Sequence, residues 1–412
     1  MPQHVRPSPP PAAPAPAAPV SGPPGAGPPP FPRRIVFLAR RDLGNPAAGG
    51  SELLVDRLAE GLTAHGHQVT LLCGGPPSPE LPAPPPLPAS PERGDPHDQG
   101  GAPARGYRVV SAGGDAGHFL RVPRQLARRV GDCDLLVEVC NGMPYLAPLW
   151  HRGPTLCLVN HVHTDLWRLR CPGPAARLGR RLEHWALAGA HRRDLMVAVS
   201  GSTASALRGL GVDPGRIRLV YNGVADPGPP VPKAPEPLFL AMGRLVEYKR
   251  IDLLLRLWER VRPVTGGRLV IVGDGPERAR LAAAAGPGVT FTGHVSEERK
   301  HQLLGSSWLL LHPSLVEGWG LVVMEAAARR TPAIGFDIPG LRDSVEDGIT
   351  GLLARGESAF AAHWCTLALS ARRRDALGRA AERRAARFRW SHTVQSFRAV
   401  AAEAVLDPLA RR

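Results

Sequence analysis

The chain of 412 residues is poor in aromatic residues and has no cysteine pair spaced for a metal or a redox centre. Phenylalanine, tryptophan and tyrosine together make up only 5% of the sequence. None of the six cysteines forms a CxxC pair, and Cys73, Cys140 and Cys157 stand in or beside apolar runs. We therefore expect buried free thiols in a reducing compartment.

Long apolar runs are absent as well. No stretch of 18 apolar residues occurs, so the sequence predicts no membrane-spanning helix. Residues 1–32 are rich in proline and alanine and lack the apolar core of a signal peptide, which predicts a disordered tail. Together these features predict a cytoplasmic protein.

Acidic residues are few relative to basic ones. The chain has 51 Lys and Arg against 36 Asp and Glu, a net charge of +15. Such a charge suits nucleic acid, an anionic membrane surface or phosphorylated substrates. Nucleic acid is not expected, because the arginines lie along helical segments such as 180–193 and 372–390 and no arginine block is interleaved with aromatics. A solvated basic face and a membrane contact both stay open.

What the sequence does contain is two series of alternating strand-like and helical runs. The first begins at RIVFLAR (34–40) and the second at LFLAM (238–242), with the proline-rich stretch 226–237 between them. Such alternation predicts parallel sheets covered by helices on both faces, with ligands bound at the carboxyl ends of the strands. The predicted domain limits are: tail 1–32, first domain 33–228 with a flexible insert 74–106, linker 229–237, second domain 238–385, and a C-terminal helix 386–412 that packs toward the first domain.

Two loops of the second series carry cations or glycines after a strand. In MGRLVEYKRIDLLL, Arg244 and Lys249 stand on one strand-to-helix loop, which suits a diphosphate, although ordinary surface charge has the same appearance. In IVGDGPER, Arg278 stands where a dinucleotide fingerprint needs a third glycine, which disfavours an oxidoreductase. Gly273 and Gly275 either let backbone approach a base or ribose or only form a tight turn.

Two further loops complete the set. In FTGHVSEERKHQLL the strand is expected to end at Val295, whose exposed backbone could read a base. In EGWGLVVMEAAA a helix begins near Gly320, where free amides and glycines without a Cβ let a phosphate approach. Glu317 would face the group attached to that phosphate, and Glu325 could accept hydrogen bonds from two hydroxyls of a ribose. A nucleotide sugar has this arrangement of groups.

The motifs, taken in order, resemble the retaining glycosyltransferase family 4, of the glycogen-synthase-like and mannosyltransferase-like group 1. The resemblance covers residues 34–390 and rests on nine segments. These are GGSE (49–52), NHVH (160–163), VAVSGST (197–203), VYNGV (220–224), GRLVEYKRID (243–252), IVGDGPER (271–278), TGHVS (292–296), HPSLVEGWGLVVMEAAA (312–328) and GLRDSVEDGITGLL (340–353). It implies an α/β protein of the GT-B fold: two doubly wound Rossmann-like domains facing a cleft, with a C-terminal helical segment.

The resemblance also implies roles for individual residues. Arg244 and Lys249 would hold the diphosphate, while Glu317 would bind the donor sugar and His163 would sit beside that sugar. A purely structural role for His163 stays open, because His161 is two residues away. The remaining substrate-binding residues implied are the loop residues Gly49 and Gly50, together with Gly273, Gly275, Val295, Gly318, Gly320, Leu321, Val322 and Glu325.

The implied activity moves a hexose from a UDP- or GDP-sugar to a hydroxyl acceptor by front-face attack, with neither a metal nor a cofactor. No DxD-type metal motif stands out in the sequence. The acceptor stays open between a lipid-linked compound, a glycan and a small molecule, and the basic helix 177–193 favours peripheral contact with the inner face of a membrane. Two alternatives remain: a catalytically inactive carbohydrate-binding or scaffold protein, and a nucleotide-sugar epimerase.

Overall fold

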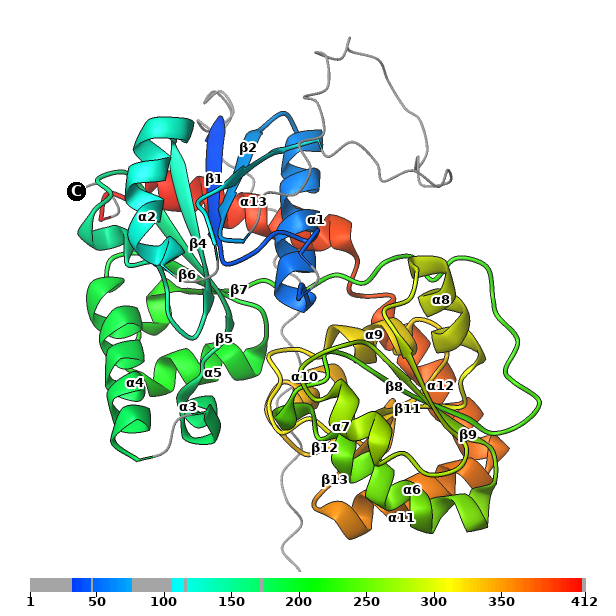
Figure 1. Cartoon of the computed structure of the whole chain (residues 1–412). Helices are drawn as coiled ribbons and strands as arrows, with labels where there is room; N and C mark the ends of the chain where they lie inside the picture. Colours follow the sequence, from blue (N-terminus) through cyan, green and yellow to red (C-terminus); the bar gives the residue numbers. More distant parts are fainter. Residues whose placement is uncertain (1–31, 46, 76–105, 115–116, 171–172, 410–412) are drawn as a thin grey trace, which may run out of the picture.

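A computed structural model describes residues 32–45, 47–75, 106–114, 117–170 and 173–409. Nearly all of the predicted tail (1–32) and of the predicted insert (74–106) lies outside these described residues, as does Cys171. The described chain forms two α/β domains, each built on one parallel sheet (Figure 1). The five cysteines in the described part are free thiols.

The first domain is built on a seven-stranded sheet of order β3-β2-β1-β4-β5-β6-β7, in which every pairing is parallel. Its strands are near-continuous apolar runs, as expected for a sheet covered on both faces. The strands are β1 (Arg34–Ala39), β2 (Gln68–Cys73), β3 (Arg108–Ser111), β4 (Leu135–Asn141), β5 (Thr155–His161), β6 (Leu195–Ala198) and β7 (Ile217–Leu219). The helices are α1 (Gly50–Ala64), α2 (His118–Gln125), α3 (Thr164–Arg170), α4 (Pro174–His184) and α5 (Gly201–Gly209).

The second domain is built on a six-stranded sheet of order β10-β9-β8-β11-β12-β13, again parallel throughout. Its strands are β8 (Leu238–Met242), β9 (Arg268–Val272), β10 (Val289–Gly293), β11 (Leu309–His312), β12 (Ala333–Phe336) and β13 (Gly351–Ala354). The helices are α6 (Ile251–Thr265), α7 (Arg278–Ala283), α8 (Glu297–Ser306), α9 (Leu321–Ala327), α10 (Leu341–Ser344), α11 (Glu357–Leu369) and α12 (Ala371–Ala385).

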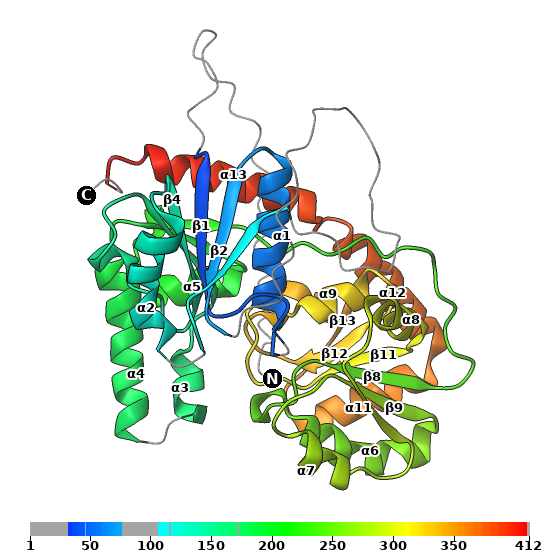
Figure 2. The same cartoon turned by 45° about the horizontal axis from the view of Figure 1, so that its top comes forward.

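The C-terminal helix α13 (Trp390–Leu406) belongs to the first domain in space, although it follows the second in sequence (Figure 2). It packs against α1 and against strands β4 to β6. Its Phe397 is fully buried and stacks on Phe37 of β1 with ring centroids 5.8 Å apart. The chain therefore crosses between the domains twice, once through the irregular residues 220–237 and once between α12 and α13.

The two-domain parallel architecture predicted from the alternating pattern is confirmed. Strand β10 ends at Gly293 rather than at the predicted Val295, and β5 ends at His161, two residues before His163. In β10 the reason is Gly293, whose φ of +71° takes the chain out of the extended conformation. These shorter strands leave Val295 and His163 on loops.

Candidate functional site

The two domains meet at an open pocket of about 560 Å³ between the carboxyl end of β5 and the loop that follows β11. Residues of both domains line it, namely His161, Val162, Thr164, Ser202, Thr203, Ala206, Leu315, Val316, Glu317 and Pro339. The lining combines hydroxyl and imidazole groups with apolar side chains and one carboxylate. This is the cleft that the sheet topology predicts, and we call it the interdomain pocket.

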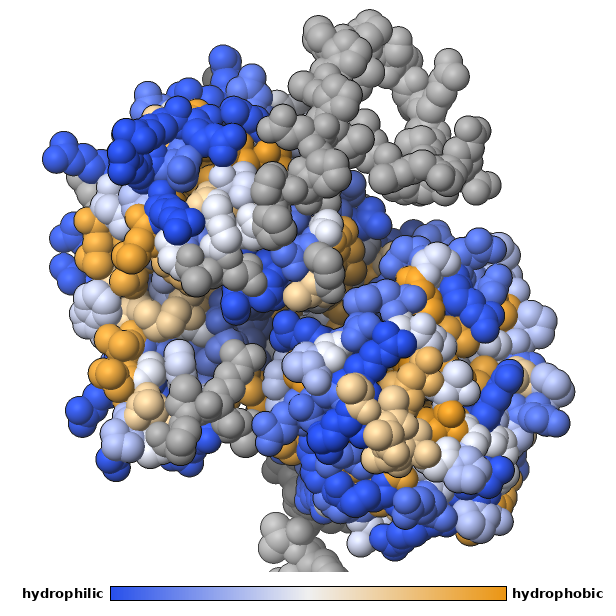
Figure 3. Space-filling view, viewed as in Figure 1, coloured by the Kyte–Doolittle hydropathy of each residue, from blue (hydrophilic) through white to orange (hydrophobic). Residues whose placement is uncertain are grey.

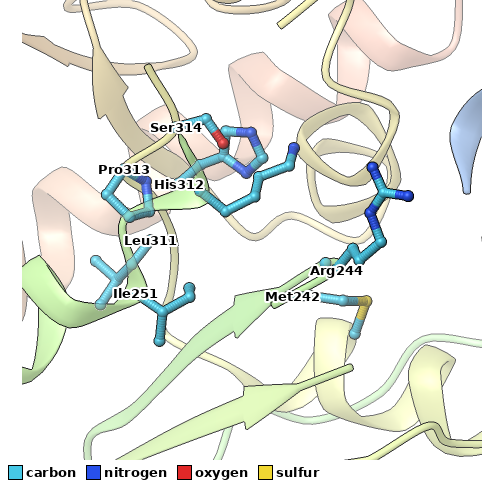
Figure 4. Close-up of a pocket in the computed structure, with 9 residues that line it drawn as sticks. Met242, Arg244, Ile251, Leu311, His312, Pro313 and Ser314 are labelled. Carbon is cyan, nitrogen blue, oxygen red and sulfur yellow. The ribbon is translucent and has the colours of Figure 1, made fainter. Parts of the chain in front are cut away.

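A second, smaller pocket of about 220 Å³ opens where β8 and β11 end in the second domain. Its lining is Met242, Gly243, Arg244, Lys249, Ile251, Leu311, His312, Pro313 and Ser314. In Figure 4 the Arg244 side chain and the His312 imidazole extend toward the same side, while Ile251 and Leu311 close the opposite side. We call this the cation pocket, because Arg244 and Lys249 both line it.

Glu317 stands between the two pockets and is held by groups of the cation pocket. Its carboxylate oxygen Oε1 forms an ion pair with Lys249 Nζ and lies 2.7 Å from His312 Nε2. Burial would raise the pKa of the Glu317 carboxyl, but the Lys249 ammonium and His312 outweigh it and hold that pKa well below its usual range. Both contacts use Oε1, which leaves Oε2 for a ligand hydroxyl.

Arg244 and Lys249 are positioned differently, although both lie on the loop after β8. The half-buried Arg244 donates from Nη2 to the Tyr248 hydroxyl at 3.3 Å. Lys249 ends a 3₁₀ turn over Glu247–Lys249. The next residue, Arg250, adopts φ +51° and pairs with Glu357 instead. Lys249 therefore lines the cation pocket, whereas Arg250, with its different backbone conformation, forms its ion pair outside that pocket.

His312 and Ser314 are site residues that the sequence analysis missed. Ser314 is 1% exposed, and its Oγ is buried without a hydrogen-bond partner in the described part of the chain. A buried hydroxyl in a pocket costs free energy until a ligand or water bonds to it. The available signal was the run WLLLHPS, in which polar residues follow directly on a buried strand.

Glu325 lies on the buried face of α9 and is engaged by a lysine that the sequence did not point to. Lys300 Nζ of α8 donates to Glu325 Oε1 at 2.9 Å and lies 2.9 Å from Glu297 Oε2. Burial would lower the pKa of Lys300, but the two carboxylates raise it above its usual value. A ribose diol at Glu325 would therefore share this carboxylate with Lys300.

Two glycines of the predicted site lie where the two domains are in contact. A Cβ at Gly318 would lie 2.2 Å from the backbone oxygen of Asn160, and one at Gly50 would lie 2.9 Å from Leu321 Cδ1. Gly49 is the N-cap of α1, directly before this contact. The loop before α9 and the start of α1 therefore touch across the cleft. The missing side chain of Gly318 accommodates the other domain, and the phosphate approach expected from the sequence stays a prediction.

Gly273 and Gly275 pack closely against the loop after β8. A Cβ at these positions would lie 2.1 Å from the Gly243 oxygen and 2.3 Å from the Leu245 oxygen. The space is thus filled by the loop after β8. Close packing of the chain on itself therefore accounts for the lack of a side chain at these glycines, and contact of their backbone with a base or ribose stays a prediction.

Gly320 is the N-cap of α9 with φ +77°, and α9 itself is short, at seven residues. Val322 and Val295 are half-buried and pack on the apolar cluster around Leu303 and Leu310. Leu321 is half-buried and packs on the cluster around Trp319. The structure brings Leu321 to the cleft and leaves Val295 on the loop before α8.

His163 is half-buried, and its ring lies against Gly142, where a Cβ would come within 2.2 Å of His163 Nδ1. His161, rather than His163, lines the interdomain pocket. The His163 amide donates to Glu183 Oε1 at 2.5 Å, and Trp167 Nε1 donates to Glu183 Oε2 at 3.0 Å. Glu183 is fully buried, and burial raises its pKa to about 7 against these two hydrogen bonds. This carboxylate was missed by the sequence analysis.

The raised pKa of Glu183 gives a testable pH dependence of stability. Between pH 4.5 and 7 the folded protein keeps a proton on Glu183 that the unfolded chain has lost, so stability falls as pH rises through this window. The total fall expected is about 3 kcal/mol. We expect Glu183→Gln to flatten this part of the curve, as measured by urea unfolding at several pH values.

The matched control is Glu298→Gln, which changes an exposed carboxylate on α8. It should leave the pH profile of the wild type in place. A Glu183→Gln profile that falls with pH as steeply as the wild type would show that Glu183 does not titrate in this window.

Comparison with known proteins identifies the family. The sequence profile "Glycosyltransferase Family 4" matches residues 48–226, and the profile "Glycosyl transferases group 1" matches residues 236–369. A D-inositol 3-phosphate glycosyltransferase of Rhodococcus erythropolis is 32% identical over 281 residues, which cover 60% of each chain. Its counterpart in Nocardia farcinica is 36% identical over 177 residues, 39% of each chain. The chain thus matches less than two thirds of the length of these relatives.

Solved structures show the same fold. Sucrose-phosphate synthase from Thermosynechococcus elongatus superposes with a TM-score of 0.69 over 89% of this chain and 97% of that one, at 21% identity. HepE from Anabaena, solved in complex with UDP and glucose, has a TM-score of 0.65 over 89% of this chain and 98% of that one, at 17% identity. The two profiles, one on each domain, confirm the resemblance seen in the motifs: the chain belongs to glycosyltransferase family 4.

Proposed function

We propose that this protein transfers a hexose from a nucleoside-diphosphate sugar to a hydroxyl acceptor, with retention of configuration. The observation that carries the proposal is the convergence of Arg244, Lys249 and Glu317 at the boundary between the cation pocket and the interdomain pocket. A diphosphate needs cations, and a sugar beside it needs an acceptor of hydroxyl hydrogen bonds. Arg244 and Lys249 supply the cations, Glu317 supplies the acceptor, and Lys249 and Glu317 are in direct contact.

The free protein holds Lys249 on Glu317, and donor binding would redistribute that charge. The Lys249 ammonium would turn toward the diphosphate, while His312 keeps the Glu317 carboxylate in place. Glu317 Oε2 would then accept a hydroxyl of the donor sugar, and Glu325 would accept the ribose diol beside Lys300. The donor class is supported by HepE, a protein of the same fold that was also solved in complex with UDP-glucose.

The proposed reaction proceeds on one face of the sugar. The acceptor oxygen forms a bond to the anomeric carbon on the face from which the diphosphate leaves, and the acceptor proton passes to a leaving phosphate oxygen. Arg244 and Lys249 would stabilise the negative charge that develops on the diphosphate. We propose that these two cations make a divalent ion unnecessary. In the described part of the chain, no group of three or more His, Cys, Asp or Glu side chains is arranged to hold a metal ion.

The reaction is proposed to take place in the cytoplasm, which the free thiols favour. Slow hydrolysis of UDP- and GDP-sugars, with water as the acceptor, tests the activity without knowledge of the natural acceptor. We expect turnover that persists with a metal chelator, and NMR should show that the first sugar released keeps the anomeric configuration of the donor. An inverted product would contradict retention. Loss of turnover on chelation would contradict metal independence, and no turnover of any donor would favour a binding or scaffold protein.

A further inference from the structure

The outer face of α4, on the first domain, exposes a stripe of large apolar side chains. Leu178 is 58% exposed, Leu182 44% and Trp185, in the turn directly after α4, 47%. Their spacing of four and three residues places them on one side of the helix. Figure 3 shows apolar patches along this edge of the first domain, surrounded by hydrophilic surface. Single exposed apolar residues are common, but three in register on one helix face indicate a contact surface.

The charge on this face has one sign. Arg177 and Arg181 are exposed between the apolar residues. We refer to these two arginines together with Leu178, Leu182 and Trp185 as the α4 surface. The one acidic residue of α4, Glu183, is fully buried on the opposite face. Apolar side chains alternating with arginines, without a carboxylate among them, match the boundary between anionic headgroups and acyl chains.

Other occupants fit less well. A second copy of the chain packed face to face would bring the arginines of both copies together without a compensating carboxylate, which is repulsive. Within the described part of the chain, no helix is long and apolar enough to cross a membrane.

We propose that the α4 surface docks the protein on anionic lipid headgroups. The three apolar side chains enter the headgroup region, and the arginines bind the phosphates. On the inner face of the same helix, Glu183 accepts a hydrogen bond from the His163 amide. A docked α4 would therefore bring the first-domain wall of the cleft close to the lipid. Docking does not require sugar transfer, so this proposal and the proposed function can fail separately.

The test is co-sedimentation of the full chain with vesicles of phosphatidylcholine alone and of an equimolar mixture with phosphatidylglycerol. We expect binding to the anionic vesicles that weakens with salt, and little binding to phosphatidylcholine. The double variant Arg177→Gln and Arg181→Gln should weaken binding to anionic vesicles about thirtyfold. The triple variant Leu178→Ser, Leu182→Ser and Trp185→Ser should abolish the binding that remains at high salt.

Matched controls come from the second domain. Val264, Ile349 and Leu369 are exposed to a similar extent, 56%, 57% and 67%, and their triple serine variant should bind like the wild type. Arg372→Gln with Arg373→Gln removes two exposed charges elsewhere and should also leave most of the binding. Wild-type protein that fails to bind anionic vesicles, α4 variants that bind as well as the wild type, or a dimer that the α4 variants dissociate would each overturn the proposal. UDP binding, followed by melting temperature, should be unchanged in the α4 variants.

Discussion

Replacing Lys249 by alanine is expected to lower kcat/KM for donor turnover about 10³-fold. The ammonium of Lys249 pairs with Glu317 in the free protein and lines the cation pocket with Arg244. Its loss removes a charge that stabilises the leaving diphosphate and also leaves the Glu317 carboxylate with His312 alone. The measurement is steady-state turnover of the best UDP- or GDP-sugar, with the melting temperature recorded for each variant.

Arg250 offers a control on the same loop. Its guanidinium pairs with Glu357 and lies over the Phe336 ring, so Arg250→Gln removes an equal charge that does not line the cation pocket. This variant should keep turnover within a small factor of the wild type. Equal losses in Lys249→Ala and Arg250→Gln would mean that net charge, rather than the position of Lys249, controls the reaction.

A single methyl group at Gly318 is expected to reduce turnover about 10²-fold. The new Cβ would lie 2.2 Å from the Asn160 oxygen, far inside contact distance, so the two domains could no longer meet as they do here. Donor binding by the second domain should survive, because the obstruction lies toward the first domain. Kinetics should therefore show a large fall in kcat, while UDP still raises the melting temperature.

Gly286→Ala is the matched control, because a Cβ at Gly286 meets no heavy atom within 4 Å. It should turn over donor like the wild type. Small-angle X-ray scattering can report the domain arrangement directly, and a more open Gly318→Ala protein is expected. Full activity of Gly318→Ala would show that the contact between Gly318 and Asn160 is not part of the reacting state.

The architecture could be predicted from the sequence, because strands of a parallel sheet that is covered on both faces are near-continuous apolar runs. RIVFLA of β1 and RLVIV of β9 are such runs. Strand β13 was not predicted, since its four residues GLLA are short and follow an irregular turn. Strand ends were less accurate than strand positions, as Gly293 illustrates.

Residues that act through distant partners could not be predicted from local patterns. Lys300 reaches Glu325 across 25 positions, and Glu183 reaches His163 across 20. Glycines posed the opposite difficulty. Gly273, Gly275 and Gly318 were noticed, but the sequence cannot say whether a missing side chain makes room for a ligand or for the protein itself, and at all three the structure places the chain's own backbone.

We propose that the second domain binds a diphosphate through Arg244 and Lys249. The most direct test compares the melting temperature with UDP, UMP and uridine at equal concentrations, since at a given concentration a ligand that binds the folded state more tightly stabilises it more. We expect a clear rise in melting temperature with UDP, a smaller one with UMP and almost none with uridine, and a loss of the UDP effect in Lys249→Ala. Equal rises with UDP and uridine, or an undiminished UDP effect in Lys249→Ala, would contradict it.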